Sequence, residues 1–311
     1  MARAVVATAY GGPEVLHLVN VDPGSPGPGQ VLLEVRAAGV NPSDWKQYSG
    51  AWGTDPSRLP MRLGHEAAGV VRAVGPDVSD VEVGDEVIAY PASGAYADRI
   101  LVKATSLVRK PASMSWDKAA GLMVAGVTAA HTLAATGVGA GDTVLEHGAS
   151  GGVGAMVVQL AHAKGARVVG TAGPVNHEYL SDLHATPVAY GPGLADRVRR
   201  AAPGGISAAI DVAGTHEALD ASVSLVPNKR RIATIAGHGY GAALGVQLLG
   251  GGEGADPGTE IRLKARSSLI RLWEAGHLDV RVGGVYLLAD VARAHRAGID
   301  GRVQGKIILH P

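Results

Sequence analysis

The sequence predicts an α/β protein with two parts, a small β-rich part and a doubly wound parallel sheet. In the first third of the 311-residue chain, short runs of β-forming residues alternate with turn clusters. From residue 143 onward, apolar strand-like runs alternate with helical runs, a pattern typical of parallel sheets covered by helices. The length also favours two domains, because single cores stop growing near this size.

Six short β-forming runs make up the first part. Clusters of glycine, proline and aspartate separate them, as in Gly75-Pro76-Asp77. Many short strands divided by such turns predict a small twisted barrel or sandwich. The predicted strands cover residues 4–8, 15–19, 31–37, 69–74, 86–90 and 99–102.

Residues 119–135 open the second part with a run of small apolar residues that predicts a buried helix. The run is short for a bilayer span and carries His131 near its end, so no membrane association is expected. The strand–helix alternation that follows predicts a parallel sheet. Its strands are expected over 143–147, 167–171, 187–190, 207–212 and 231–236, and its helices over 153–164, 176–184, 193–201 and 216–225.

The last part of the chain leaves this alternation. Residues 244–249 are consistent with one further strand. Residues 250–258 (GGGEGADPG) are too rich in glycine for a helix or a strand and predict a linker or mobile loop. Helices are expected over 259–275 and 289–297, and a closing strand over 306–309.

Composition and charge exclude several classes of function. The formal net charge is zero, so binding to nucleic acid or to an anionic membrane is not expected. The chain has no cysteine, which excludes disulfides, thiolate catalysis and cysteine-ligated metals and fits a reducing compartment. The N-terminus lacks the layout of a secretion signal, so a cytoplasmic location is expected.

The strongest local motif lies between the predicted strand 143–147 and the helix that follows. It reads Ala149-Ser150-Gly151-Gly152-Val153-Gly154. Gly151 would let the backbone approach a pyrophosphate, and Gly154 would let helix and strand pack closely. The helix N-terminus would offer free N–H groups to the phosphates. The motif therefore predicts a dinucleotide-binding site.

The segment after the second strand of the sheet favours NADPH over NADH. An NAD site requires a carboxylate there for the ribose 2′-hydroxyl, and this segment has no acid before Glu178. A 2′-phosphate would not be repelled, and His177, Thr171 or Tyr190 could donate hydrogen bonds to it. No arginine or lysine lies near, so the preference depends on these three side chains.

In order and spacing, several motifs of this chain resemble the medium-chain dehydrogenase/reductase superfamily, in its quinone oxidoreductase (zeta-crystallin-like) branch. The resemblance covers essentially the whole chain. Besides the glycine motif, the matching pieces are GVNPSD (39–44), GHEAAG (64–69), GDEV (84–87), GAYAD (94–98), DVAG (211–214) and GKIIL (305–309).

The resemblance implies a GroES-like catalytic domain built from both chain ends and a Rossmann domain inserted between them. We expect residues 1–118 and 257–311 in the first and residues 119–256 in the second. It also implies an active cleft at their junction, and a homodimer in which the Rossmann sheets join edge to edge.

Alcohol dehydrogenases share this fold and use a catalytic zinc, so a metal site needs its own argument. Asn41 stands where their first cysteine ligand would be, and the four-cysteine structural lobe is missing. A zinc site would have to be improvised from His65, Glu66 and Asp44, because catalytic zinc elsewhere uses histidine and carboxylates. We expect no metal, with His65 and Glu66 as structural residues.

The resemblance also implies which residues hold the cofactor. Asn41 matches the asparagine of the family's cleft beside the nicotinamide. Thr128 matches the threonine that contacts the nicotinamide ribose or ring. Gly214 and Gly237 would border the cofactor after the fourth and fifth strands of the sheet.

The chain departs from the family around residues 44–52, where quinone reductases often carry tyrosines at the positions of Lys46 and Trp52. A cationic Lys46 in the cleft could polarise a carbonyl oxygen or act as an acid; the alternative is that it points to solvent. Tyr48 is a second candidate to face the cleft. Trp45 and Trp52 are expected to line the substrate pocket.

These features together predict an NADPH-dependent, zinc-independent reductase of a quinone or an α,β-unsaturated carbonyl compound. In such an enzyme the cofactor carries the chemistry and the protein aligns it with a small-molecule acceptor. One alternative is an enoyl reductase of a biosynthetic pathway. Another is a non-catalytic NADPH-binding sensor or structural protein, which would bind the cofactor without turnover.

Overall fold

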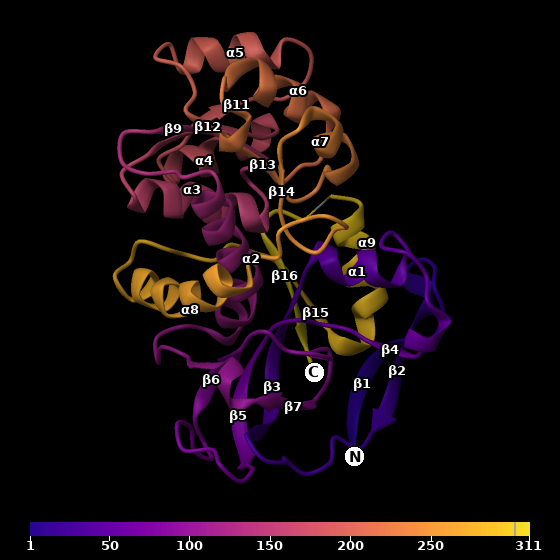
Figure 1. The fold of residues 1–311 in the computed structure, drawn as a ribbon. Helices are drawn as coiled ribbons and strands as arrows, with labels where there is room; N and C mark the ends of the chain where they lie inside the picture. The colour runs from indigo at the N-terminus through magenta and orange to yellow at the C-terminus, as the bar shows by residue number, and fades with distance from the viewer. Residues whose placement is uncertain (302) are drawn as a thin grey trace. The chain divides into compact units, whose positions relative to one another are not determined.

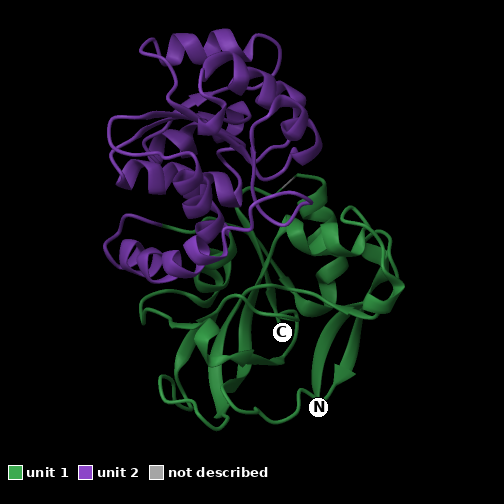
Figure 2. Cartoon of the chain, viewed as in Figure 1, with its two compact units in different colours: residues 1–124, 279–311 green, residues 125–278 purple. Residues whose placement is uncertain are grey.

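The computed structural model describes residues 1–301 and 303–311, which form two compact units (Figure 2). Unit 1 contains residues 1–124 and 279–311, and unit 2 contains residues 125–278. This division differs from both predicted domain boundaries, 118/119 and 256/257. Helix α2 (Trp116–Ala135) runs through residues 118 and 119 without a break.

The second boundary differs because of helix α8 (Thr259–Glu274), which was predicted with the catalytic domain. Leu269 of α8 packs against Gly126 of α2, where an added β-carbon would lie 2.7 Å from Leu269 Cδ1. Both residues belong to unit 2, so α8 groups with the parallel sheet.

Unit 1 contains two β-sheets, and all six strands predicted for the first part of the chain form in it (Figure 1). The smaller sheet has the order β2 (Leu16–Val21), β1 (Ala2–Ala7), β4 (Met61–Arg62). The larger sheet has the order β15 (Val282–Leu287), β16 (Lys306–His310), β3 (Gln30–Val40), β5 (Ala67–Val74), β6 (Glu86–Ala89), β8 (Leu107–Arg109), and β7 (Arg99–Lys103) also pairs with β3.

Strand β3 is the centre of unit 1, because it pairs with β16, β5 and β7. Val31, Leu33 and Val35 alternate along it as buried residues and join the apolar core, as expected for a strand with one face inside. Gly69 of β5 lies against it so closely that a β-carbon there would be 2.1 Å from the Glu34 carbonyl oxygen. Glycine is therefore required at residue 69.

Unit 1 also contains elements that the sequence pattern did not predict. Helix α1 (Pro42–Tyr48) begins after Asn41, with proline at its first position. Its seven residues are too few to show a helical period. Strand β15 contains two glycines, and it forms because its backbone pairs in parallel with β16.

Unit 2 is a doubly wound sheet, as predicted. Its strands run in the order β11, β10, β9, β12, β13, β14, with parallel pairing throughout, which is the arrangement of a dinucleotide-binding fold. The strands are β9 (Thr143–His147), β10 (Arg167–Thr171), β11 (Thr186–Val188), β12 (Ala208–Asp211), β13 (Ile232–Thr234) and β14 (Gln247–Leu248).

Helices connect these strands. They are α3 (Gly152–Ala163), α4 (His177–Asp182), α5 (Leu194–Ala201), α6 (His216–Leu225) and α7 (His238–Leu244), of which α7 was not predicted. In unit 1, the helix predicted over 289–297 forms as α9 (Val291–Ile299). No helix among the described residues is long and apolar enough to cross a membrane.

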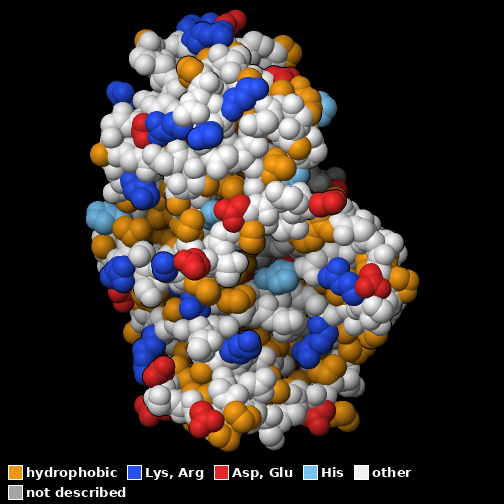
Figure 3. Space-filling view, in the orientation of Figure 1, with side chains coloured by type: hydrophobic (Ala, Val, Ile, Leu, Met, Phe, Trp, Pro, Cys, Tyr) orange, Lys and Arg blue, Asp and Glu red, His pale blue; other side chains and the backbone are white. Residues whose placement is uncertain are grey.

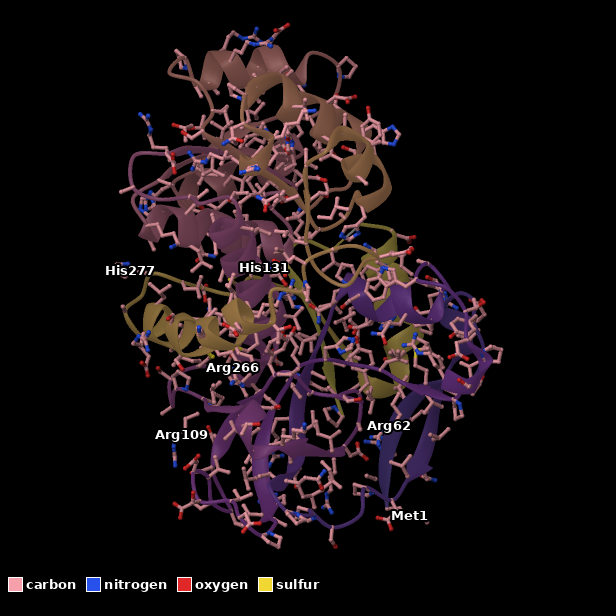
Figure 4. All side chains as sticks on the ribbon, in the orientation of Figure 1. Met1, Arg62, Arg109, His131, Arg266 and His277 are labelled. Carbon is pink, nitrogen blue, oxygen red and sulfur yellow. The ribbon has the colours of Figure 1, made fainter. Side chains whose placement is uncertain are left out.

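Residues 250–258, predicted as a linker or mobile loop, are held at both ends. The Gly250 N–H donates to the Asp256 carbonyl and the Asp256 N–H donates to the Leu248 carbonyl, both within 2.9 Å. The Asp256 carboxylate lies 3.2 Å from Nε2 of His131, which Figure 4 labels on α2. The segment is therefore a turn held by hydrogen bonds rather than a free linker.

Candidate functional site

The glycine motif forms a tight turn between β9 and α3. Gly148 begins the turn with φ +83°, a left-handed conformation that favours glycine, and α3 begins at Gly152. A β-carbon on Gly154 would lie 2.3 Å from the Gly148 carbonyl oxygen, so only glycine lets the helix approach the turn. Residues 150–153 remain half-buried, which leaves the loop backbone accessible.

Thr171, at the end of β10, contacts the first residue of this turn. The Gly148 N–H donates to Thr171 Oγ1 at 3.3 Å, and His147 Nδ1 lies at the same distance from that hydroxyl. Thr171 is buried at 3% exposure. Its hydroxyl is engaged inside the protein, and its contact with a 2′-phosphate stays a prediction.

A buried carboxylate joins the turns that contain Gly214 and Gly237. Asp211 Oδ1 accepts hydrogen bonds from the N–H groups of Ala213 and Gly214 at 3.0 and 2.9 Å. Its Oδ2 accepts from Thr234 Oγ1 at 2.7 Å, and Thr234 Oγ1 accepts from the Gly237 N–H at 2.9 Å. Burial raises the pKa of Asp211, partly offset by these donors.

Sequence reasoning had named the two glycines but not Asp211 and Thr234 as the side chains that position them. A polar residue at the end of each of two neighbouring buried strands was the available signal. The carboxyl ends of parallel strands meet at the same edge of a sheet, where such folds place their ligands.

His177 and Tyr190 lie after β10 and β11. His177 opens α4, and its Nε2 is 3.2 Å from the Ala172 carbonyl oxygen. Tyr190 is 64% exposed, and its hydroxyl would lie 3.5 Å from a β-carbon on Gly173. The hydroxyl thus lies near the turn that precedes His177, and contacts of both residues with a 2′-phosphate stay predictions.

Thr128 lies on α2 and is buried in the same unit, with 6% exposure. Its hydroxyl has no hydrogen-bond partner among the described residues. Its contact with a nicotinamide stays a prediction.

In unit 1, Asn41 belongs to a buried polar cluster with Glu66 and Lys306. Lys306 Nζ donates to Asn41 Oδ1 at 2.5 Å, to Glu66 Oε1 at 2.9 Å and to the Val40 carbonyl at 3.2 Å. Asn41 Nδ2 donates to Glu66 Oε1 at 3.1 Å, and the Val124 N–H donates to Glu66 Oε2 at 2.8 Å. All three side chains are at most 5% exposed.

This cluster changes what Asn41 can do. Both polar ends of its amide are bonded within the protein, and Asn41 thereby joins Lys306 and Glu66. Its place beside a nicotinamide and a catalytic role stay predictions. Gly39 is required beside it, because a β-carbon there would lie 2.5 Å from Glu66 Oε1. Sequence reasoning missed Lys306; a lysine inside a short apolar strand was the signal available.

The buried face of α1 holds Asp44 and Tyr48. Asp44 Oδ2 accepts from the Asn41 N–H at 2.8 Å and from the Tyr96 hydroxyl at 2.6 Å. The Tyr48 hydroxyl lies 2.8 Å from His295 Nδ1, and the two rings stack. Tyr48 is fully buried, and its place in a substrate pocket stays a prediction.

The two tryptophans predicted for the pocket differ in their surroundings. Trp45 packs against the core of unit 1, edge-on to the His295 ring at 5.9 Å between centroids. Trp52 is 40% exposed. Trp52 is therefore the more accessible of the two.

Lys46 points away from the buried face of α1. It is two residues from both Asp44 and Tyr48, which places it on the opposite side of the helix. Its side chain is nevertheless half-buried, and desolvation lowers the pKa of the Lys46 amine. Such an amine loses its proton more readily than a fully solvated lysine.

His65 lies in the turn that precedes β5, next to α1. Its Nε2 is 2.5 Å from Gln47 Nε2 and 3.6 Å from Asp44 Oδ1. Among the described residues no three His, Asp or Glu side chains gather as a metal site. The surface seen in Figure 3 intersperses basic and acidic side chains, in keeping with a net charge of zero.

Two family models match this chain. The model for the alcohol dehydrogenase GroES-like domain matches residues 27–112, and the model for zinc-binding dehydrogenases matches residues 178–309. Together they cover most of both units.

Individual relatives match over the whole chain. A quinone oxidoreductase of Pseudomonas aeruginosa is 31% identical over 100% of both chains. The synaptic vesicle membrane protein VAT-1 homolog of Rattus norvegicus is 30% identical over 99% of this chain and 84% of its own length. A mycobacterial protein solved in complex with NADPH matches with a TM-score of 0.87 at 30% identity, over 100% of both chains.

Proposed function

Because this chain belongs to the medium-chain dehydrogenase/reductase superfamily, in its quinone-oxidoreductase-like branch, we propose that it is a zinc-independent, NADPH-dependent reductase of a quinone or an α,β-unsaturated carbonyl compound. The observation that carries this proposal is the glycine turn from Gly148 to Gly154, which is closed tightly against α3. Its half-buried backbone faces the start of a helix, where N–H groups favour phosphate.

The geometry fits a dinucleotide, and we assign the contacts accordingly. Ser150, Gly151, Gly152 and Val153 would hold the pyrophosphate, while Gly214 and Gly237 would border the cofactor from the turns that Asp211 fixes. Thr128 would contact the nicotinamide end. A bound dihydronicotinamide supplies the hydride; the protein binds and orients the reactants.

The choice of NADPH is supported by the exposed Tyr190 hydroxyl and His177. Both lie where a 2′-phosphate is expected, and no carboxylate precedes Glu178 there. The mycobacterial relative was solved with NADPH. We propose that Tyr190 and His177 donate to this phosphate.

The residues around Asn41 do not fit a zinc ion. The Lys306 ammonium lies 2.5 Å from Asn41 Oδ1 and 2.9 Å from Glu66 Oε1, so a positive charge already occupies the space between these oxygens. A second cation there would be repelled, and Glu66 Oε2 is bonded to the backbone. Metal-free chemistry is therefore part of the proposal.

The proposal extends to the assembly and the cellular location. The sheet of unit 2 ends on β14, a strand whose only partner among the described residues is β13. Such an edge can pair with a second copy, as expected for a homodimer. A small-molecule substrate and a cytoplasmic location remain predictions from the sequence.

The test is oxidation of NADPH and NADH by purified, EDTA-treated protein, with a small quinone and an enone as acceptors. We expect turnover with NADPH, a preference over NADH of about tenfold or more, and no effect of the chelator. Added zinc should give no stimulation. Activity that disappears with EDTA and returns with zinc would refute the metal-free part, and binding without any turnover would refute the reductase assignment.

A further inference from the structure

The turn after β11, residues 189–193, contains Tyr190 and is rich in glycine. Gly191 and Gly193 both have a positive φ, of +102° and +81°. Glycine loses more conformational freedom on ordering than any other residue, so such a segment is costly to hold in one conformation. The turn therefore depends on contacts from the rest of unit 2.

Arg197 of α5 supplies three of these contacts. Its Nε donates to the Ala189 carbonyl at 2.9 Å, its Nη1 to the Pro192 carbonyl at 2.7 Å and its Nη2 to the Gly191 carbonyl at 2.7 Å. Helix α5 begins directly after the turn and lies beside β11 (Figure 1). The planar guanidinium thus binds the carbonyls on both sides of Tyr190 and fixes the backbone that presents this side chain.

Glu217 of α6 holds the same turn from its N–H side. The Gly191 N–H donates to Glu217 Oε2 at 2.9 Å. Arg197 forms no ion pair with a carboxylate in the part of the chain that the structure describes. Arg197 and Glu217 bring one positive and one negative charge to the turn, and together they leave it without a net charge that would repel a phosphate.

The Tyr190 hydroxyl is available to a ligand. The residue is 64% exposed, and its hydroxyl has no hydrogen-bond partner among the described residues. A β-carbon on Gly173 would lie 3.5 Å from this oxygen, so the hydroxyl lies close to the turn that follows β10. Dinucleotide-binding folds recognise the ribose 2′ position at that turn.

We propose, on the basis of the proposed function, that Arg197 is a positioning residue that sets the preference for NADPH over NADH. Its three hydrogen bonds hold the turn so that the Tyr190 hydroxyl donates to the 2′-phosphate. NADH has a neutral hydroxyl in place of this phosphate. Because a hydrogen bond to a charged group is stronger than one between neutral groups, the positioned donor favours NADPH.

The affinity depends on Arg197 because the turn is ordered before the cofactor arrives. A binding group that is already in place does not lose conformational freedom on binding. Without Arg197 the glycine turn would be ordered by the phosphate itself, at the expense of affinity. Glu217 would then be the one charge bonded to the turn, and it would repel the phosphate.

The first experiment measures the dissociation constants of NADPH and NADH by fluorescence titration of the whole protein. Arg197→Gln should raise the NADPH constant about tenfold and leave the NADH constant within about twofold of wild type. The unchanged NADH constant would also show that the glycine turn from Gly148 to Gly154 is intact. Arg200→Gln is the matched control, because Arg200 is exposed on the same helix, and it should change neither constant.

A second pair of ligands restricts the measurement to the adenosine end of the cofactor. Adenosine 2′,5′-bisphosphate carries the 2′-phosphate, and adenosine 5′-monophosphate lacks it. Arg197→Gln should weaken binding of the bisphosphate about tenfold and leave binding of the monophosphate unchanged. An equal loss for both ligands would mean that Arg197 supports the fold of the site rather than the recognition of the 2′-phosphate, and would overturn the inference.

A double variant tests whether Arg197 acts through Tyr190. Tyr190→Phe alone should weaken NADPH binding about tenfold, and adding it to Arg197→Gln should cause no further loss. Additive losses would show that the two residues act independently, and would overturn the positioning role. Arg197→Lys keeps the charge but offers one nitrogen to three carbonyls, so it should also lose most of the preference. Wild-type preference in Arg197→Lys would show that the charge alone matters, which contradicts the inference.

The outcomes distinguish this inference from the function on which it rests. A wild-type protein that binds neither dinucleotide, or binds both equally well, would overturn the proposed NADPH dependence itself. A wild-type protein that prefers NADPH and keeps this preference in Arg197→Gln would overturn the role of Arg197 and leave the proposed reductase intact.

Discussion

At the residue scale, two buried histidines make the stability of this protein sensitive to acid. His147, on β9, and His295, on α9, are both inside the core, and burial lowers the pKa of each to about 4. His147 contacts the hydroxyls of Ser222 and Thr171, and His295 contacts Tyr48. Both are held as neutral rings.

These shifts predict a loss of stability in acid. An unfolded histidine has a pKa near the reference value of 6.5, so between pH 6.5 and 4 the unfolded state binds more protons than the folded state. The free energy of unfolding should therefore fall with decreasing pH in this window, by up to about 1.4 kcal/mol per pH unit for each histidine. Urea denaturation at several pH values measures this slope.

His295→Gln should flatten the slope between pH 6.5 and 4 and leave it unchanged between pH 7 and 8, where His295 binds no proton in either state. Equal slopes in the variant and the wild type below pH 6 would contradict the assignment.

The roles of individual residues were the part of the structure that the sequence predicted least well. It named Asn41 and Tyr48, but both are enclosed and bonded, because Lys306 and His295 arrive from the far end of the chain to contact them. No local pattern carries a contact across more than 240 positions. His65 was named as a structural residue and, with Glu66 and Asp44, as part of an improvised zinc site; the buried Asp44 Oδ1 without a hydrogen-bond donor is visible only in the fold.

At the element scale, helix α3 can exist only because Gly154 lets it approach the turn before it. A β-carbon there would lie 2.3 Å from the Gly148 carbonyl oxygen and 2.7 Å from Ala149 Cα, both of which are backbone atoms and cannot move aside alone. The helix start would have to shift, and the phosphate-binding N–H groups would shift with it.

Gly154→Ala should therefore destabilise the protein by about 1–3 kcal/mol and weaken NADPH binding by about tenfold or more. Gly139→Ala is the matched control: no atom lies within 4 Å of its added carbon, and its φ is not left-handed. That variant should keep full affinity. Thermal unfolding and fluorescence titration provide the two readouts, and unchanged NADPH affinity in Gly154→Ala would count against the loop as the phosphate site.

Elements with strong local patterns were predicted well. The bounds of β9, β10 and α6 agree with prediction because each is a self-contained apolar or amphipathic run. Strand β15 and helix α7 were not predicted, because β15 depends on pairing with β16 and α7 is a short glycine-rich helix. Their formation is decided by partners and not by local propensity.

At the scale of the whole molecule, Lys306 joins the two ends of the chain in unit 1. It begins β16, which pairs with β3, and its ammonium bonds Asn41 and Glu66 more than 200 positions earlier. Removing one partner of a buried ion pair leaves the other charge uncompensated, which is far more costly than losing an exposed pair.

Lys306→Met should accordingly lower the free energy of unfolding by about 3–5 kcal/mol, and adding Glu66→Gln should recover part of that loss. The exposed pair Lys264–Glu260 provides the comparison, with both side chains at least 80% exposed. Lys264→Met should have no measurable effect. Urea denaturation measures the free energy of unfolding of each variant. If the double variant is no more stable than Lys306→Met alone, the unpaired charge of Glu66 is not the cause of the loss.

The edge-on contact of Trp45 with His295 gives this protein an optical reporter of its own acid response. A charged imidazolium next to an indole quenches the indole's emission, whereas the neutral ring does so far less. Since the ring centroids are 5.9 Å apart, Trp45 emission should dim when His295 gains its proton, before or together with unfolding. The chain has four tryptophans, so the His295 contribution is the part of the fluorescence titration that is lost in Trp45→Leu.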